Sequence, residues 1–287
     1  MNRNSIEMLE QRRLLSASLT SGVLRAVGDD GVANTIKVDL NDAGTQYVVD
    51  INGTTTNFDL AGVRRVIIHG AELADSLEVD DSVNVRQNIF GYDGNDTITG
   101  GSSADELAVQ FANRRGPRGW CRLWGMGGDD TIIANGGRNF LDGGIGNDTI
   151  TGSDARDLIA GFLGNDTIDA KGGNDIVHGG ADNDVIDLGD GNDLCLAGAG
   201  DDNVTGGDGN DRIFGQEGND TITGGDGNDS LFGINGADSL LGESGNDVLV
   251  GGDEEDFLDG GEGTNRIIQR EIPTVSELVD EVVNTSI

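Results

Sequence analysis

Residues 206–233 read GGDGNDRIFGQEGNDTITGGDGNDSLFG, and most of them are glycine, aspartate or asparagine. Such a composition is typical of a disordered linker. Three aspartates are nevertheless each followed, two positions later, by an aliphatic residue, and these pairs recur every nine residues. The three pairs are Asp211 and Ile213, Asp220 and Ile222, and Asp229 and Leu231. Because a disordered chain has no reason to keep this spacing, the stretch indicates a structural repeat.

The nine-residue repeat runs from residue 125 to residue 268 without insertion or deletion, which gives 16 units. Position six is Asp in 14 units, and the exceptions are Asn139 and Asn265. Position four is Gly in 13 units, and the exceptions are Ala155, Asp182 and Glu254. Position eight is apolar in all 16 units. Three positions held in phase over this distance argue against a low-complexity linker.

Each position of the repeat has a physical role. Positions one to six are rich in glycine and aspartate, so they predict a turn. Positions seven to nine favour a short strand, on which position eight faces opposite to its two neighbours. One such strand cannot bury its aliphatic residue alone, but stacked coils of two units each can. The repeat therefore predicts an all-β fold, a parallel β-roll (β-solenoid) of about eight 18-residue coils, roughly 40 Å long.

Composition narrows the classes of partner. The 287 residues carry a formal charge of −34, from 52 acidic and 18 basic residues. Nucleic acid and anionic membranes are therefore poor partners, while cations are good ones. No stretch is long and apolar enough to predict a membrane span. The two cysteines do not suggest a disulfide framework, and Cys195 stands at position eight, where it is expected to be a small buried hydrophobe.

The units resemble the RTX, or haemolysin-type, calcium-binding nonapeptide GGxGxDxUx, in which U is a large aliphatic residue. The best matches are GGIGNDTIT at 143–151, GFLGNDTID at 161–169 and GGDGNDSLF at 224–232. The resemblance implies a parallel β-roll that binds several Ca²⁺ ions between turns stacked on the same edge. Each ion would take Asp carboxylates and backbone carbonyls from two turns that are 18 residues apart. This agrees with the six to eight oxygen ligands that Ca²⁺ prefers.

The resemblance identifies the aspartates at position six as metal ligands, and the complete unit at 91–99 adds one more. The predicted ligands are Asp96, Asp130, Asp148, Asp157, Asp166, Asp175, Asp184, Asp193, Asp202, Asp211, Asp220, Asp229, Asp238, Asp247 and Asp256. Within residues 125–268, one edge has seven gaps with Asp on both sides and the other has five, twelve in all. Twelve divalent ions would bring the formal charge from −34 to −10.

The predicted sites are not all equal. Side chains at Ala155, Asp182 and Glu254 are expected to strain their turns, because glycine usually occupies that position. Asn139 and Asn265 stand at the two ends of one edge and suggest worn ends of the array.

The flanks have their own patterns. Residues 1–20 resemble the LEPRxLL sorting motif of bacterial surface proteins, through LEQRRLLS at 9–16. Residues 21–90 are expected to form a β-rich extension and cap, with strands at 35–40, 47–51, 56–60 and 63–70, and 91–124 to hold worn repeat units with a basic insertion. Residues 125–268 form the predicted roll. Residues 269–287 suggest either a short amphipathic helical cap or a secretion signal.

The stretch VQFANRRGPRGWCRLW at 109–124 does not fit the repeat. It contains both tryptophans and four arginines, which is compatible with binding of an acidic polysaccharide. A protruding loop and a stretch read out of frame are the alternatives.

The sequence contains no recognisable catalytic set, so we expect no enzymatic activity. Its two histidines form no HExxH motif, and no GxSxG or Walker A pattern occurs. The leading hypothesis is a secreted, extracellular or cell-surface protein in which calcium binding is coupled to folding. The alternative is a noncatalytic polysaccharide-binding or adhesion module built on the calcium-loaded roll. An enzyme of unrecognised type is a third possibility.

Overall fold

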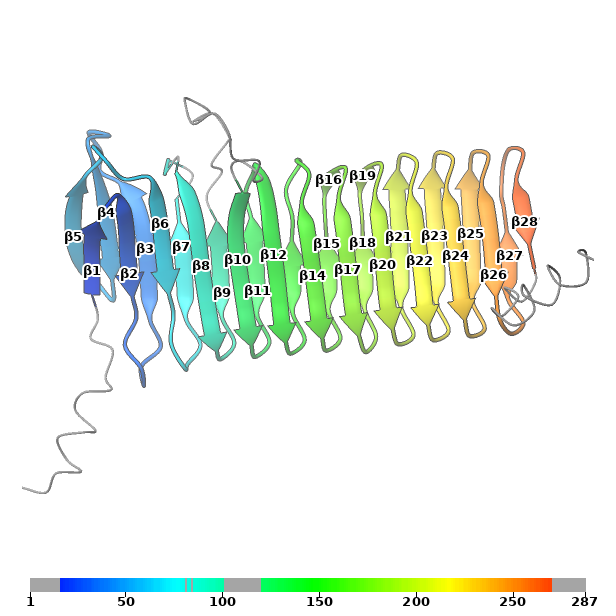
Figure 1. The fold of residues 1–287 in the computed structure, drawn as a ribbon, viewed down its shortest axis with the longest axis horizontal. Coiled ribbons are helices and arrows are strands. Elements are labelled where there is room, and N and C mark those ends of the chain that lie inside the picture. Colours follow the sequence, from blue (N-terminus) through cyan, green and yellow to red (C-terminus); the bar gives the residue numbers. More distant parts are fainter. Residues whose placement is uncertain (1–15, 81, 84, 101–119, 270–287) are drawn as a thin grey trace, which may run out of the picture.

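The chain winds into a rod of stacked β coils (Figure 1). The computed structural model describes residues 16–80, 82–83, 85–100 and 120–269, and every element in these ranges is a β-strand. Strands of successive coils lie side by side in parallel, so that Ile150 is paired with Ile132 on one side and Ile168 on the other. The predicted all-β parallel solenoid is confirmed.

Two sheets run along the rod. Sheet 1 has 13 strands, in the order β1 (Ser16–Thr20), β2 (Val23–Val27), β6 (Arg65–His69), β8 (Arg86–Asp93), β10 (Trp120–Gly127), β12 (Arg138–Ile145), β14 (Leu158–Leu163), β17 (Ile176–Ala181), β20 (Leu194–Ala199), β22 (Arg212–Glu217), β24 (Ser230–Asn235), β26 (Val248–Gly252) and β28 (Arg266–Ile268).

Sheet 2 has 15 strands, and 13 of them form its main path. Their order is β27 (Phe257–Asp259), β25 (Ser239–Ser244), β23 (Thr221–Asp226), β21 (Asn203–Asp208), β18 (Val185–Asp187), β15 (Thr167–Asp169), β13 (Thr149–Thr151), β11 (Thr131–Ala134), β9 (Thr97–Gly100), β7 (Ser76–Val79), β3 (Thr35–Leu40), β4 (Gln46–Ile51) and β5 (Thr54–Asp59). The short strands β16 (Gly172–Gly173) and β19 (Asp190–Gly191) pair beside this path.

The turns between the sheets form two edges of the rod. Edge 1 is the row of turns that lead from sheet 1 to sheet 2, and it contains Asp130 between β10 and β11. Edge 2 is the row of turns that lead back to sheet 1, and it contains Asp157 between β13 and β14. Because two nonapeptides make one coil, successive turns of the repeat alternate between the two edges.

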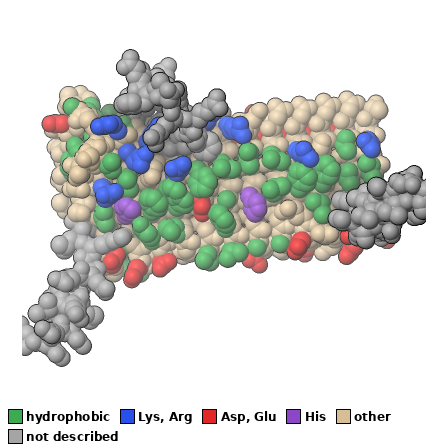
Figure 2. Space-filling view, in the orientation of Figure 1, with side chains coloured by type: hydrophobic (Ala, Val, Ile, Leu, Met, Phe, Trp, Pro, Cys, Tyr) green, Lys and Arg blue, Asp and Glu red, His purple; other side chains and the backbone are tan. Residues whose placement is uncertain are grey.

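Alternation along each strand separates core from surface. Ile213 on β22 is fully buried, while its neighbour Arg212 is exposed and Phe214 is half-buried. Outward side chains of sheet 1 are largely apolar, and Figure 2 shows hydrophobic side chains gathered in a band along one face of the rod. Those of sheet 2 are largely hydroxyl-bearing, such as Thr149 and Thr167. The two outer faces therefore differ, although their inward positions are alike.

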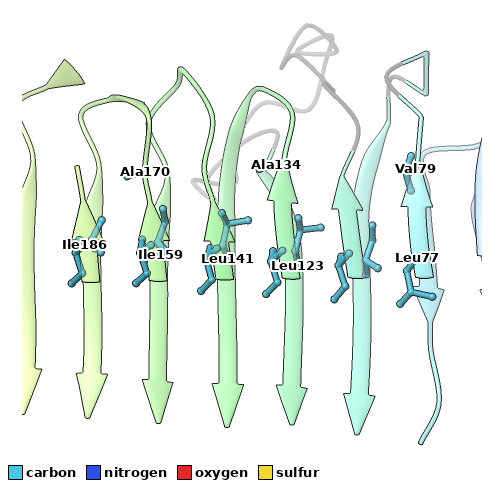
Figure 3. Packing of buried hydrophobic residues seen from close by; sticks show 14 of the residues in the cluster. Leu77, Val79, Leu123, Ala134, Leu141, Ile159, Ala170 and Ile186 are labelled. Carbon is cyan, nitrogen blue, oxygen red and sulfur yellow. The ribbon is translucent and has the colours of Figure 1, made fainter. Parts of the chain in front are cut away.

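The core is a column of aliphatic side chains between the sheets (Figure 3). Position-eight residues such as Leu141 and Ile159 are 0% exposed, and burying one such side chain contributes ~1.5–3 kcal/mol. Cys195 is a free, fully buried cysteine in the same column, so its predicted role as a buried hydrophobe is confirmed. Ile267 in the last unit is 47% exposed, so the uniform burial expected of position eight does not reach the end of the array.

The N-terminal extension closes the core at one end. Strands β3, β4 and β5 form an antiparallel meander, and β1 and β2 form a hairpin. Asn52 and Gly53 connect β4 to β5 with φ of 52° and 81°, as a two-residue hairpin turn requires. Val49 and Ile51 join the core from this meander. The strands expected at 35–40, 47–51, 56–60 and 63–70 are confirmed to within a few residues.

The segment at 109–124 needs a correction. β10 begins at Trp120, and its Leu123 is 0% exposed between Ile89 and Leu141 of the adjacent strands. Residues 120–124 therefore belong to a regular coil and are not foreign to the roll. The step from Asp96 to Asp130 is 34 residues, whereas later steps along this edge are 18. Residues 101–119 lie within this longer step and outside the described ranges.

The number of coils was also predicted too low. The solenoid has about ten turns, because the N-terminal strands join the same two sheets as the repeats. The described residues contain no helix, and the helical cap expected at 269–287 falls almost entirely on residues 270–287, which lie outside the described ranges. The sorting motif at 9–16 also lies outside them, apart from its last residue.

Candidate metal centre

The position-six aspartates form a continuous ladder along each edge. The backbone N–H of each aspartate donates to Oδ1 of the aspartate one coil later, at 2.6–3.0 Å. On edge 1 the ladder joins Asp75, Asp96, Asp130, Asp148, Asp166, Asp184, Asp202, Asp220, Asp238 and Asp256. On edge 2 it joins Asn139, Asp157, Asp175, Asp193, Asp211, Asp229, Asp247 and Asn265. All fifteen sequence-predicted aspartates therefore lie in the two ladders.

The second carboxylate oxygen has no partner in almost every rung. Oδ2 is buried without a hydrogen bond at Asp96, Asp130, Asp148, Asp166, Asp175, Asp184, Asp193, Asp202, Asp211, Asp220, Asp229, Asp238, Asp247 and Asp256. An unsatisfied buried polar atom costs about 1–3 kcal/mol, and more when it is charged. One such atom is an ordinary imperfection, but fourteen at the same position of a repeat fit the binding of a positively charged ligand.

Backbone carbonyls lie beside these oxygens. A Cβ added to Gly233 would collide with Asp238 Oδ2 and would lie 2.6 Å from the carbonyl oxygen of Gly251, one coil later. Position four is equally tight: Gly209 has φ of +139°, and a Cβ there would collide with the carbonyl oxygen of Gly191. A side chain does not fit at Gly233 or Gly209, because backbone carbonyl oxygens of the adjacent coil fill the space.

The electrostatics of the ladder are unfavourable without a cation. Burial, with neighbouring carboxylates adding to it in most rungs, raises the aspartate pKa well above its ordinary value. The pKa is raised to about 7 at Asp130, Asp148, Asp175, Asp184, Asp202 and Asp238. It is raised to about 6 at Asp96, Asp157, Asp166, Asp193, Asp211, Asp220 and Asp229. A bound cation would reverse this effect, because it favours the ionised form.

The donor set fits Ca²⁺. Carboxylate and carbonyl oxygens are the ligands of a hard cation, and calcium accepts six to eight of them in flexible geometry. The described residues contain no group of three His, Cys, Asp or Glu side chains that converge on one point. This is expected of a gap that two stacked turns enclose, because it offers carboxylates from two aspartates and must take its other ligands from the backbone.

Asp157 departs from the predicted pattern. Ser153 donates its backbone N–H to Asp157 Oδ2 at 2.8 Å, and its hydroxyl lies 3.0 Å from the same oxygen. Asn139 Nδ2 donates to Asp157 Oδ1 at 2.8 Å and to the carbonyl oxygen of Gly137 at 2.9 Å. Protein donors thus satisfy both oxygens of Asp157. Hydrogen bonds from Asn139 and Ser153 fill the gap before Asp157, whereas the other gaps of the ladder are expected to hold a cation.

The other ends of the ladders use similar closures. Asn265 Nδ2 donates to the carbonyl oxygen of Gly260 at 2.6 Å, at the C-terminal end of edge 2. At the N-terminal end of edge 1, Asn34 and Ala71 satisfy both oxygens of Asp75. The sequence marked the two asparagines as worn ends but did not identify Asn34 or Ser153, because neither stands at a ligand position of the repeat. The sequence did contain one sign of these closures. An asparagine at position six supplies N–H donors in place of a negative charge.

The three exceptions at position four behave differently. Asp182 and Glu254 keep the left-handed backbone that glycine usually supplies, with φ of 75° and 76°. Their turns are therefore intact despite the side chain. Ala155 is not among the residues with positive φ, and it lies in the turn that Ser153 closes. Of the three turns that lack glycine at position four, only the turn of Ala155 therefore has a different backbone conformation.

Sequence reasoning also missed the role of position five. Exposed asparagines at this position form a second ladder, in which Asn210 N and Nδ2 donate to Asn192 Oδ1 at 3.0 and 2.9 Å. Asn228 repeats the pattern one coil later. This ladder needs no metal ligand, and in the folded rod it holds successive turns in register beside the aspartate ladder.

Comparison with known proteins agrees with this geometry. The family model for the RTX calcium-binding nonapeptide repeat, in four copies, matches residues 87–108, 124–159, 160–195, 196–231 and 232–267, which is more than half of the chain. No curated protein matches the chain. No helix in the described part of the chain has the length and apolar character that crossing a membrane requires.

Proposed function

Because the chain belongs to the family of RTX calcium-binding nonapeptide repeats, which bind multiple Ca²⁺ ions, we propose that these ions occupy the gaps of both aspartate ladders and thereby drive folding. The observation that carries this proposal is the row of fourteen buried Oδ2 atoms without hydrogen-bond partners. The proposed ligands are the aspartates of those rungs and the carbonyl oxygens beside them. The gap between Asn139 and Asp157 is excluded, because hydrogen bonds fill it.

Coupling to folding follows from where the ligands are found. The carboxylates and carbonyls of one gap come from residues 18 positions apart, so they converge only when two coils are stacked. A ligand that binds only the folded state stabilises that state by its binding free energy. Without calcium, ionised aspartates of one ladder face each other at the spacing of neighbouring strands, and the chain carries a formal charge of −34. We infer that the repeat region is expanded at low calcium.

The test is a calcium titration followed by far-ultraviolet circular dichroism, with equilibrium dialysis to count the bound ions. We expect a β spectrum that appears with calcium and is lost on adding a chelator. The expected uptake is several ions per chain, in one cooperative transition. A β spectrum of the repeat region that is unchanged by the chelator would contradict the coupling.

Export and domain organisation remain part of this proposal. A chain that stays expanded in a low-calcium cytosol and folds in calcium-rich surroundings suits a secreted or cell-surface protein. The β-roll is a structural calcium-binding fold that is generally noncatalytic, so we infer a structural role for the rod. We propose residues 125–268 as the calcium-dependent unit and residues 21–90 as its cap, with worn units between them at 91–124.

A second candidate function, binding of an acidic polysaccharide, is favoured by a file of arginines at the N-terminal end of sheet 1. These arginines come from five successive strands and are Arg25, Arg65, Arg86, Arg122 and Arg138. No carboxylate in the described part of the chain forms an ion pair with any of them. Unpaired cations spaced along a rod complement a linear polyanion.

This candidate can be tested separately with a polyuronate as the probe. Isothermal calorimetry in calcium should detect binding to the parent chain and weaker binding to Arg86→Ala/Arg122→Ala. Arg266→Ala, at the opposite end of sheet 1, is the control and should bind like the parent chain. Equal binding by all three proteins would contradict a role for the arginine file.

A further inference from the structure

The outer face of sheet 1 is apolar over most of the rod. The register places Phe140, Leu158, Ile176 and Leu194 side by side on four successive strands. The next row contains Leu196, Phe214, Phe232 and Val250, again on successive strands. All eight point outward and are half-buried, each shielded in part by its neighbours in the row. We name these eight residues the apolar face.

The corresponding face of sheet 2 is hydrophilic. Its outward residues on the matching strands are mainly threonine, with Asp169 and Asp187 among them. Because both sheets bury the same kind of aliphatic residue, the core does not require this difference. Apolar outward residues therefore occur in every second nonapeptide for a reason other than folding, such as contact with a partner.

Aromatic contacts and exposed side chains extend the apolar face. Phe90 and Trp124 stack in its second row with ring centroids 4.5 Å apart, and Phe214 and Phe232 stack at 4.8 Å. The ends of β10, β12 and β14 toward edge 1 contribute four exposed side chains. These are Met126 at 44% exposure, Ile145 at 63%, Phe162 at 47% and Leu163 at 50%. Exposed apolar side chains on neighbouring turns typically mark an interaction surface.

The size of the surface suits a protein interface. Nine strands, β8 to β26, span about 40 Å at the usual strand spacing, and six residues along each strand span about 20 Å. The whole outer surface of sheet 1 is then roughly 800 Å² per molecule, which equals the area that each partner buries in a standard stable interface, and the two rows occupy about half of it. Aromatic residues and arginine are enriched and acids are few, as in the centre of protein interfaces.

We propose that the apolar face is a dimer interface, in which it packs on the same face of a second copy of this chain. A regular parallel sheet needs a partner surface of equal length and strand spacing, and another copy provides one. β17 is the central strand of the nine, so a two-fold axis parallel to β17 aligns the two surfaces completely. This proposal rests on the calcium-loaded rod proposed above, because the face exists only when the coils are stacked.

Charge supports this arrangement. Asp142 on β12 is the only acidic side chain among the outward residues of β8 to β26 within the two rows. Arg212 on β22 lies over the rings of Phe214 and Phe232, at 5.0 and 5.7 Å from their centroids. β12 and β22 are equally far from β17 in the sheet. The axis over β17 therefore brings Asp142 close to Arg212 of the partner subunit, twice in each dimer.

Sedimentation velocity in calcium tests the interface. The parent chain should form a dimer in the micromolar range or tighter. Leu194→Glu/Leu196→Glu on β20 places two charges in the apolar face and should weaken dimerisation at least 100-fold. Asn203→Glu/Thr205→Glu, on the next strand along the chain, places the same charges on the sheet 2 face and should leave the dimer intact. Circular dichroism in calcium shows separately whether each variant folds.

A cysteine at the axis tests the register. His178 is exposed on β17, and facing sheets lie about 10 Å apart, so a short thiol-reactive bis-maleimide should crosslink His178→Cys to its copy in calcium but not Thr205→Cys. A folded parent chain that stays monomeric would overturn the proposal, as would equal dissociation by the two glutamate variants. Dimers that form without the His178→Cys crosslink would overturn the proposed axis. A chain that does not fold with calcium would instead contradict the proposed function.

Discussion

Replacing Asp220 by Asn should reduce the number of bound calcium ions and raise the free energy of unfolding of the calcium-free rod. Asp220 lies in the middle of edge 1, where its Oδ1 accepts a hydrogen bond from Asp202 N at 2.9 Å and its Oδ2 has no partner. Asp220→Asn can keep the first interaction and places an amide nitrogen where the unpaired oxygen was. The structure already contains this solution at Asn265, whose Nδ2 donates to a glycine carbonyl.

The magnitude follows from the pKa. Burial raises the pKa of Asp220 from 3.8 to about 6. Each unit corresponds to 1.36 kcal/mol, so at neutral pH the ionised carboxylate destabilises the calcium-free fold by roughly 3 kcal/mol. Asp220→Asn has no charge and should recover most of that amount. Asp220 lies between Asp202 and Asp238, so in calcium the same variant lacks a carboxylate ligand beside a gap, and the number of bound ions should fall by at least one.

The matched control is Asp201→Asn, which lies on the same edge one coil earlier, next to Asp202. Asp201 is exposed, and its Oδ1 accepts a hydrogen bond from Asn219 N at 2.8 Å, which an amide oxygen can also accept. Both variants remove one negative charge, so the difference between them isolates the buried position. Equilibrium dialysis counts the ions, and urea unfolding in chelator with a stabilising osmolyte compares the calcium-free rods. Equal ion counts for the two variants would refute the assignment of Asp220.

Three further outcomes are expected. Asn139→Asp/Ser153→Gly removes the hydrogen bonds that close one turn and should add one bound calcium ion, counted by dialysis; an unchanged count would mean that the turn does not admit a cation. The ladder carboxyls have folded pKa values of about 6 to 7, above the unfolded value, so the calcium-free rod should be most stable in acid and lose that stability as pH rises through 6 to 7. Protons should for the same reason weaken calcium binding below about pH 6, and a pH-independent affinity would contradict the burial of these groups. Gly209→Ala brings a Cβ against the carbonyl of Gly191 and should lower stability in calcium by ~3 kcal/mol or more, whereas Gly31→Ala, which has positive φ but open space, should cost about 1 kcal/mol.

The regular part of the fold was predictable because the same residue types recur at the same positions of every nonapeptide. Position eight supplies the core and position six the ladder, so Ile213 and Asp220 were placed correctly without a structure. The predicted number of coils was too low because it counted only the regular repeats at 125–268. The N-terminal coils depart from the repeat sequence and were left out. Leu123 shows why this misleads: it occupies its core position although Cys121 stands where the repeat has Asp. Stacking depends on the buried aliphatic residue more than on the turn.

The candidate site was predictable at the level of residue type and not of individual occupancy. Asp157 and Asp175 look alike in the sequence, since both stand at position six of the repeat and precede an aliphatic residue. Only the folded turn reveals that Ser153 satisfies Asp157 Oδ2 while Asp175 Oδ2 is left without a partner. Whether a carboxylate needs a cation depends on the donors within hydrogen-bond distance, and here these are Asn139 from the preceding coil and Ser153, which replaces the usual glycine.

The sequence by itself determined the nine-residue period, the inward and outward positions, the acidic ladders and the preference for calcium, because each is a local pattern that recurs in phase. The tertiary structure decided which gaps hydrogen bonds fill, how many turns the solenoid has and where the two faces differ. Those features depend on which side chains become neighbours across coils, and only stacking brings residues 18 positions apart into contact.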